Sequence, residues 1–332
     1  MPSLLEIKKV NSLGHIILNR PQALNALSDE MLRNITQALV DFTDDPKIKI
    51  IAISSTAEKA FCAGGDVRWM ATTKNRQIQL DFFAHEYHLN GAIAKLNKPY
   101  VSLMNGLTMG GGVGIGLHGS YSIATESFVF AMPETAIGLF PDVGASYILS
   151  RLPQGIGMYL ALTGQRVNAF LAHELGLVKY VIMDENKASC IEDLSNLSTS
   201  IDAYFAKLHI NKPQNFGSEM AYIEQCFTQN SIEDIINALR DLNNPWAHKT
   251  LNTLNACSPL SLKVTFLQLN RAAGKSLYEC LATDKKLVKH FLAGHDFYEG
   301  VRAMLIDKDK TPHWSPKTLA EISDKDVELY FS

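Results

Sequence analysis

The sequence has few cysteines, and nothing in their spacing suggests that they cross-link the chain. Its 332 residues contain five, at positions 62, 190, 226, 257 and 280, and no C-x-x-C pair. An odd count without paired spacing argues against a disulfide framework and against structural zinc, and it is typical of a reducing compartment. We therefore expect a cytoplasmic protein, or an organelle-matrix protein from which a transit peptide has been removed.

The sequence also lacks an excess of charge of either sign. Thirty-one Lys and Arg residues stand against 34 Asp and Glu residues, which gives a net charge of −3. Such a balance supplies no overall attraction to nucleic acid or to an anionic membrane. We expect no nucleic-acid partner, and an anionic ligand would have to be held by local donors.

Long apolar runs are missing as well. The longest uncharged stretch is residues 99–125, but it holds seven glycines together with Asn105 and His118. A lipid-facing helix of about 20 residues would be dominated by large aliphatic and aromatic side chains. The start of the chain has no apolar core behind a basic end, so no secretory signal is expected. We interpret residues 99–125 as a buried strand, a glycine turn and a buried helix, and expect no membrane association.

What is present is an ordinary globular composition, with 46% hydrophobic and 20% charged residues. Two short strands at 4–10 and 14–19 suggest a hairpin, Ser28 is placed to cap a helix, and further strands and helices follow to about residue 183. This order predicts an α/β core of stacked ββα units. Residues 184–220 are polar and predict a connector with some helix, and residues 231–330 predict several helices.

Two glycine-rich segments follow predicted strands. They are AFCAGGD (60–66) and NGLTMGGGVG (105–114), and both leave backbone N–H groups uncovered by side chains. Two such loops could direct two N–H groups at one oxygen and so stabilise the oxyanion that forms when a thioester carbonyl is attacked. The alternative interpretation is two ordinary glycine turns.

One segment also matches the residue pattern of a nucleotide-binding motif. GIGLHG (114–119) matches G-x-G-x-x-G, and Glu134 follows 20 residues after Gly114. In a dinucleotide fold these glycines form the turn directly after a strand. Here they fall inside the predicted apolar helix, well past the preceding strand, so we expect no nicotinamide cofactor.

Two carboxylates lie in a third segment, MPETAIGLFPDVG (132–144), which is otherwise apolar or small. Glu134 and Asp142 in such surroundings would have raised pKa values, as suits acid–base groups, and two neighbouring carboxylates can divide roles. A capping glutamate and a turn aspartate are the alternative.

Together these segments resemble the enoyl-CoA hydratase/isomerase, or crotonase, superfamily, and in particular its branch that hydrolyses 3-hydroxyisobutyryl-CoA in valine catabolism. The segment HDFYEGVRAMLIDKDKTPHW (295–314) resembles the same branch. The resemblance implies a crotonase-like spiral of stacked ββα units with a helical C-terminal region. We accordingly expect a core at residues 1–185 and a connector with a helical region at residues 186–332.

The resemblance also implies roles for individual residues. Gly65 and Gly111 would supply the oxyanion-hole N–H groups, and Ala63 and Gly64, with Gly65, would line the coenzyme A site. Glu134 matches the catalytic glutamate. The other two implied carboxylates are Asp142, the second catalytic group of the hydrolases, and Glu86, a substrate-binding residue.

The implied activity is hydrolysis of an acyl-CoA thioester, with coenzyme A as part of the substrate and with no cofactor and no metal. Hydratases place a second glutamate where this chain has Gly114, so the pair of glutamates typical of water addition is missing. An enoyl-CoA isomerase or hydratase remains an alternative, as does a catalytically silent CoA-binding or scaffold protein. Crotonase relatives often form trimers, so a homo-oligomer is one expected assembly, although the longer C-terminal region could cover that interface instead.

Overall fold

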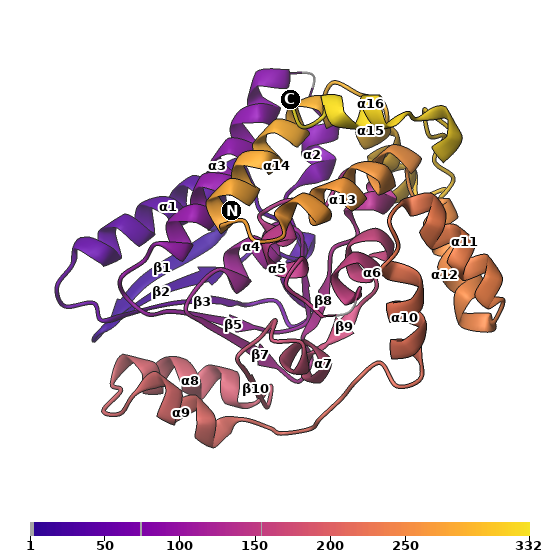
Figure 1. The fold of residues 1–332 in the computed structure, drawn as a ribbon. Coiled ribbons are helices and arrows are strands. Elements are labelled where there is room, and N and C mark those ends of the chain that lie inside the picture. The colour runs from indigo at the N-terminus through magenta and orange to yellow at the C-terminus, as the bar shows by residue number, and fades with distance from the viewer. Residues whose placement is uncertain (1–2, 74, 154) are drawn as a thin grey trace. The chain divides into compact units, whose positions relative to one another are not determined.

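The chain folds into two compact units, each built from separated segments. The computed structural model describes residues 3–73, 75–153 and 155–332 (Figure 1). The first unit contains the segments Met1–Asp66, His85–Ala131 and Arg166–Asn215, and the second contains Val67–Ala84, Met132–Gln165 and Phe216–Ser332. The division expected between residues 185 and 186 falls inside the last segment of the first unit, and it stays a prediction.

The first unit contains two β-sheets. The larger has the strand order β1-β2-β3-β5-β7-β10, antiparallel between β1 and β2 and parallel elsewhere. The smaller has the order β4-β6-β8-β9, with only the last pair antiparallel. The strands are β1 (Leu5–Val10), β2 (Leu13–Leu18), β3 (Ile50–Ser55), β4 (Ala60–Cys62), β5 (Tyr100–Met104), β6 (Leu107–Met109), β7 (Tyr121–Thr125), β8 (Val129–Ala131), β9 (Val167–Asn168) and β10 (Tyr180–Ile182).

Local sequence signals explain the first elements. β1 and β2 pair as the predicted hairpin, and Asn11 takes the left-handed conformation, with φ of 50°, at its turn. Helix α1 (Asp29–Asp44) begins after Ser28, whose side chain accepts a hydrogen bond from the Met31 N–H group. The other helices of this unit are η1 (Pro21–Ala23), α4 (Gly111–Leu117), α7 (Ala169–Glu174), α8 (Asn186–Ser195) and α9 (Ile201–Leu208).

Helices α8 and α9 are more than a connector. Residues 184–220 are polar on average, but both helices bury apolar side chains in one cluster with residues of the six-stranded sheet, including Leu13. These side chains are Cys190 and Leu194 on α8 and Ile201 and Phe205 on α9. Figure 1 shows both helices beside β7 and β10. The spacing of these apolar residues gives each helix one buried side. The mean hydropathy of the segment does not show this, because polar residues on the other side dominate it.

The second unit is helical. Its helices are α2 (Val67–Thr72), η2 (Glu134–Ile137), α5 (Ala145–Leu149), α6 (Ile156–Thr163), α10 (Glu219–Phe227), α11 (Ile232–Leu242), α12 (Pro245–Ala256), α13 (Pro259–Ala272), α14 (Leu277–Phe291), α15 (Asp296–Val301), η3 (Arg302–Ile306), η4 (Leu319–Glu321) and α16 (Asp324–Leu329). Ser231, Ser258 and Ser276 cap α11, α13 and α14 by accepting a backbone N–H group. Helix α3 (Arg76–Ala94) has residues in both units.

The long uncharged stretch folds into buried strands and a buried glycine-rich helix, as predicted. It forms β5, β6, the glycine-rich helix α4 and β7, and thus belongs to both sheets. Among the described residues, no helix combines the length and the apolar character that crossing a bilayer requires.

Candidate functional site

The two glycine loops of the first unit lie next to each other. Strand β4 leads into Gly64 and Gly65, β6 leads into Gly111, and β4 and β6 are parallel neighbours, so both loops leave the same end of the sheet. A Cβ atom on Gly111 would lie 3.2 Å from the backbone nitrogen of Gly65, and one on Gly64 would lie 3.8 Å from that of Gly111. The structure thus brings together the two glycines expected to bind an oxyanion, and that role stays a prediction.

Backbone hydrogen bonds to the loop before α1 hold the first glycine segment. Ala63 N–H donates to Leu24 O at 3.0 Å, Leu27 N–H donates to Gly64 O at 2.8 Å, and Asp66 N–H donates to Leu27 O at 2.9 Å. Gly64 has a φ of +114°, a conformation that residues with a side chain rarely adopt. The peptide planes around Gly65 are therefore fixed by the fold before any ligand binds.

Glu86, on α3, lies beside these glycines. Its side chain is buried, and a Cβ atom on Gly111 would overlap its Oε1 atom. Burial and then the charge of Glu86 raise the pKa of the Cys62 thiol to about 12. Because a thiol must ionise to act as a nucleophile, the buried Cys62 thiol in the AFCAGGD segment is poorly suited to that role.

In the second unit, Glu134 opens the short helix η2. The residue is 6% exposed. Burial, and then the negative charge of Asp142, raise the pKa of the Glu134 carboxyl well above its usual range. Such a carboxyl holds a proton at a higher pH than an exposed glutamate and suits a group that exchanges protons. Glu134 and Asp142 thus lie in one unit, close enough for the charge of Asp142 to raise the pKa of Glu134.

Helix η2 is supported by the C-terminal part of the chain. Ser258 N–H donates to Thr135 O at 3.1 Å, and Ser258 Oγ donates to the buried carboxylate of Asp296 at 2.6 Å. A Cβ atom on Gly138, at the end of η2, would overlap the carbonyl oxygen of Asp296. Residues 295–314, which the sequence resemblance singled out, therefore help to position the helix that carries Glu134.

The turn that carries Asp142 is held by α13 and α14. Gln268 Nε2 donates to Pro141 O at 3.1 Å and to Asp284 Oδ1 at 2.9 Å. Gly144 N–H donates to Asp284 Oδ2 at 2.8 Å. Burial, and then the charge of Asp142, raise the pKa of the Asp284 carboxyl well above its usual range.

Sequence reasoning missed Asp284 and Gln268. Asp284 stands before Lys285 and Lys286 in a helix rich in charge, where it reads as a surface residue. A signal was available, because Asp284 lies at helical spacing from Cys280, Leu281, Leu287 and Val288, all of which are buried.

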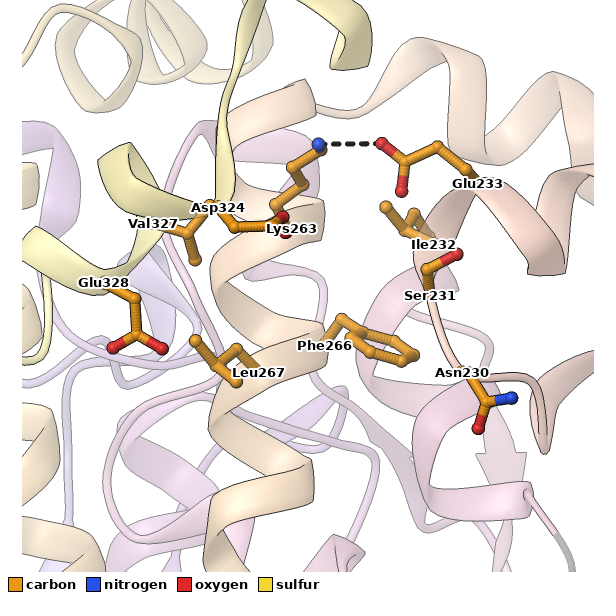
Figure 2. Close-up of a pocket in the computed structure, with 10 residues that line it drawn as sticks. All are labelled: Asn230, Ser231, Ile232, Glu233, Lys263, Phe266, Leu267, Asp324, Val327 and Glu328. Atoms are coloured by element: carbon orange, nitrogen blue, oxygen red, sulfur yellow. Dashed lines mark ion pairs between the residues drawn. The ribbon is translucent and has the colours of Figure 1, made fainter.

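The second unit also contains cavities. One, of about 300 Å³, is lined by α11, α13 and α16; it has Phe266 and Leu267 on one side and the Lys263–Glu233 ion pair, at 2.7 Å, on another (Figure 2). A second, of about 480 Å³, is lined partly by Lys317, Thr318 and Cys257. Neither is lined by a residue that the sequence predicted to be catalytic. Within residues 3–73, 75–153 and 155–332, no three His, Cys, Asp or Glu side chains are grouped so that they could hold a metal ion.

Comparison with known proteins identifies the family. Residues 13–331 match the family described as enoyl-CoA hydratase/isomerase. The chain is 42% identical to mitochondrial 3-hydroxyisobutyryl-CoA hydrolase of Mus musculus, over 96% of this chain and 86% of that protein. It is 41% identical to the Homo sapiens protein of the same name, over 98% of this chain and 87% of that protein.

Solved structures agree with this result. A carnitinyl-CoA dehydratase from Mycobacterium thermoresistibile superimposes with a TM-score of 0.94 at 33% identity, covering 99% of this chain and 96% of that one. An enoyl-CoA hydratase from Rhodobacter sphaeroides gives a TM-score of 0.92 at 33% identity, covering 99% and 97%. These matches confirm the expected α/β crotonase-like fold. The chain belongs to the enoyl-CoA hydratase/isomerase family.

Proposed function

We propose that this protein hydrolyses the thioester of 3-hydroxyisobutyryl-CoA and releases 3-hydroxyisobutyrate and coenzyme A. The observation that carries the proposal is the likeness to proteins named 3-hydroxyisobutyryl-CoA hydrolase, at about 42% identity over nearly the whole chain. The adjacent Gly65 and Gly111 and the buried Glu134 supply groups that suit this chemistry.

In the proposed reaction the thioester oxygen accepts hydrogen bonds from the N–H groups of Gly65 and Gly111. Negative charge grows on this oxygen when the carbonyl carbon is attacked, and a fixed donor of this kind lowers the barrier by about 2.7–4 kcal/mol. Ala63 and Gly64 line the coenzyme A portion, and Glu86 binds the substrate. Coenzyme A is part of the substrate, and the proposed steps use neither a metal nor a separate cofactor.

Glu134 supplies the catalytic carboxylate. It either attacks the carbonyl carbon and forms a mixed anhydride, which water then hydrolyses, or removes a proton from the attacking water. Asp142 binds the substrate hydroxyl or positions the proton that the leaving sulfur takes. Both routes require Glu134 to be ionised at the moment of attack.

A second candidate function is hydration or dehydration of an acyl-CoA. It is favoured by the two solved structures at 33% identity, whose titles name a dehydratase and a hydratase. Gly114 argues against hydration or dehydration, because a glycine offers no second carboxyl group for syn addition of water. Loss of the ultraviolet absorbance of an enoyl thioester would reveal this activity, whereas released thiol reveals hydrolysis.

The decisive experiment measures thiol release from a panel of acyl-CoA thioesters by the purified protein and by Glu134→Gln. We expect 3-hydroxyisobutyryl-CoA to be cleaved by the unaltered protein. We expect kcat to fall by about 10³-fold or more in the variant, since the glutamine can neither attack nor accept a proton. Binding of coenzyme A should survive, because the glycine loops are unchanged. A protein that binds coenzyme A but releases no thiol would be the silent CoA-binding alternative.

We also propose where the protein is located and how it assembles. The relatives named above are mitochondrial by name, which favours the organelle-matrix alternative over the cytoplasm. A homo-oligomer remains the proposed assembly.

A further inference from the structure

A buried amide lies one helical turn beyond Glu86 and has no assigned role. Asn90, on α3, is 0% exposed. Within the described residues, neither its Nδ2 nor its Oδ1 atom has a hydrogen-bond partner. A buried amide group without partners costs stability, and such groups in folded proteins call for a functional explanation.

The surroundings of Asn90 connect it to the oxyanion glycines. Glu86 and Asn90 are four residues apart and so lie on one side of α3. Glu86 lies against Gly111, and Asn90 lies against Gly114: a Cβ atom on Gly114 would be 2.6 Å from Asn90 Nδ2 and 2.9 Å from Oδ1. The glycine at position 114 thus leaves the space that the amide occupies.

The spacing along α4 fits a short acyl chain. Gly111 and Gly114 are three residues apart, or about 4.5 Å along the helix axis. An acyl chain that follows α4 from a thioester oxygen bound at Gly111 would bring its first carbons level with Gly114 and therefore with the Asn90 amide. In a 3-hydroxyacyl group the hydroxyl oxygen is three bonds from the carbonyl carbon. A carboxamide both donates and accepts hydrogen bonds, and so does a hydroxyl group.

We propose that Asn90 is a specificity-determining residue, whose amide binds the 3-hydroxyl group of the acyl chain. This inference rests on the proposed thioester hydrolysis and names the group by which that site selects its substrate. A hydroxylated acyl group would supply the partners that the amide lacks, and an acyl group without a hydroxyl would not. Asp142 would then not bind the hydroxyl group, and its role would be to position the proton that the leaving sulfur takes.

The experiment compares kcat/KM for 3-hydroxyisobutyryl-CoA and isobutyryl-CoA, which lacks the hydroxyl group, in the unaltered protein and in Asn90→Leu. Leucine has a similar volume and no polar atoms, so the variant should fold. The control is His88→Leu, an exposed position on the same helix. We expect the unaltered protein and the control to favour the hydroxylated thioester by about tenfold or more, the effect of a hydrogen bond to a buried polar group.

In Asn90→Leu we expect this preference to fall to within about twofold of unity, through slower cleavage of the hydroxylated thioester. The melting temperature should stay equal or rise, because the variant no longer buries an unpaired amide. A parallel loss of activity on both thioesters, an unchanged preference, or a lower melting temperature would overturn the inference and indicate a structural role. If the unaltered protein cleaves neither thioester, the proposed function itself fails, and the inference fails with it.

Discussion

At the scale of single residues, Gly111 shows why this position needs the absence of a side chain. A methyl group there would overlap Glu86 Oε1 and lie 3.1 Å from Leu27 Cδ1 and 3.2 Å from the Gly65 nitrogen. Glu86 can move, because the contact is with the end of a flexible side chain. The Gly65 backbone cannot, so the methyl group would stay in front of the amide that the proposal assigns to the oxyanion.

We therefore expect Gly111→Ala to fold and to lose activity. The loss of one donor predicts a fall in kcat of about 10²–10³-fold. The control is Gly116→Ala in the same helix, whose Cβ would meet the flexible Met104 Sδ at 2.6 Å. Thiol-release kinetics and thermal unfolding of both variants test this. Equal activity losses in the two variants would show that the helix, and not the amide, is responsible.

Whether a site residue could be predicted from the sequence depends on the sequence around it. Gly65, Gly111 and Glu134 stand in short motifs that resemble a known family, so the resemblance could assign each of them an expected role. Asn90 and Asp284 stand in ordinary helical sequence, and their importance comes from burial against residues distant in the chain. Burial of a polar side chain is a tertiary property, which a single sequence indicates only through its spacing from apolar residues.

At the scale of elements, the turn carrying Asp142 depends on helices more than 100 residues later in the sequence. Val143 has a φ of 53°, an unfavourable conformation for a β-branched residue. The turn is held in this conformation by Gln268, which bridges Pro141 and Asp284, and by Asp284, which binds the Gly144 N–H group. Helices α13 and α14 thus position a proposed catalytic carboxylate without themselves supplying one.

This arrangement predicts a combined effect of Gln268→Leu. The substitution keeps the volume but leaves Asp284 Oδ1 and Pro141 O without their donor, which should lower the free energy of unfolding by about 2 kcal/mol. It should also lower kcat, because the Asp142 turn loses an anchor. Urea unfolding and thiol-release kinetics measure the two effects. Gln225→Leu, at an exposed position, is the control and should change stability by less than about 0.5 kcal/mol.

Elements differ in how far the sequence determines them. The helices α1, α11, α13 and α14 were predictable, since capping serines and apolar spacing act within a few residues. The packing of α8 and α9 against the six-stranded sheet was not, because Cys190, Leu194, Ile201 and Phe205 are few among many polar neighbours. Local capping thus fixes where a helix starts, while its partner surface depends on the whole fold.

At the scale of the whole molecule, the buried carboxyl groups oppose folding at neutral pH. The pKa of Glu134 is raised in the folded protein by burial and by Asp142. An acid whose folded pKa exceeds its unfolded value binds more protons when folded, so its ionisation destabilises the fold as pH rises above the unfolded value, about 4.3 for glutamate. Glu299 is the opposite case, since its ion pair with Arg302 lowers its pKa to about 2.

Glu134→Gln should therefore gain stability relative to the unaltered protein, by an amount that grows as pH increases from about 5 toward 8. Glu299→Gln should be less stable than the unaltered protein by an amount that hardly varies over the same range, because both pKa values of Glu299 lie below it. Urea unfolding of the three proteins at several pH values separates the two cases. A gain for Glu134→Gln that stays flat or shrinks with pH would mean that Glu134 ionises as an ordinary carboxyl, and its proposed proton-transfer role would lose its electrostatic support. If the stability gain of Glu134→Gln grows with pH, the ionised Glu134 carboxyl destabilises the folded protein. Such a cost is expected where a residue is retained for function and not for packing.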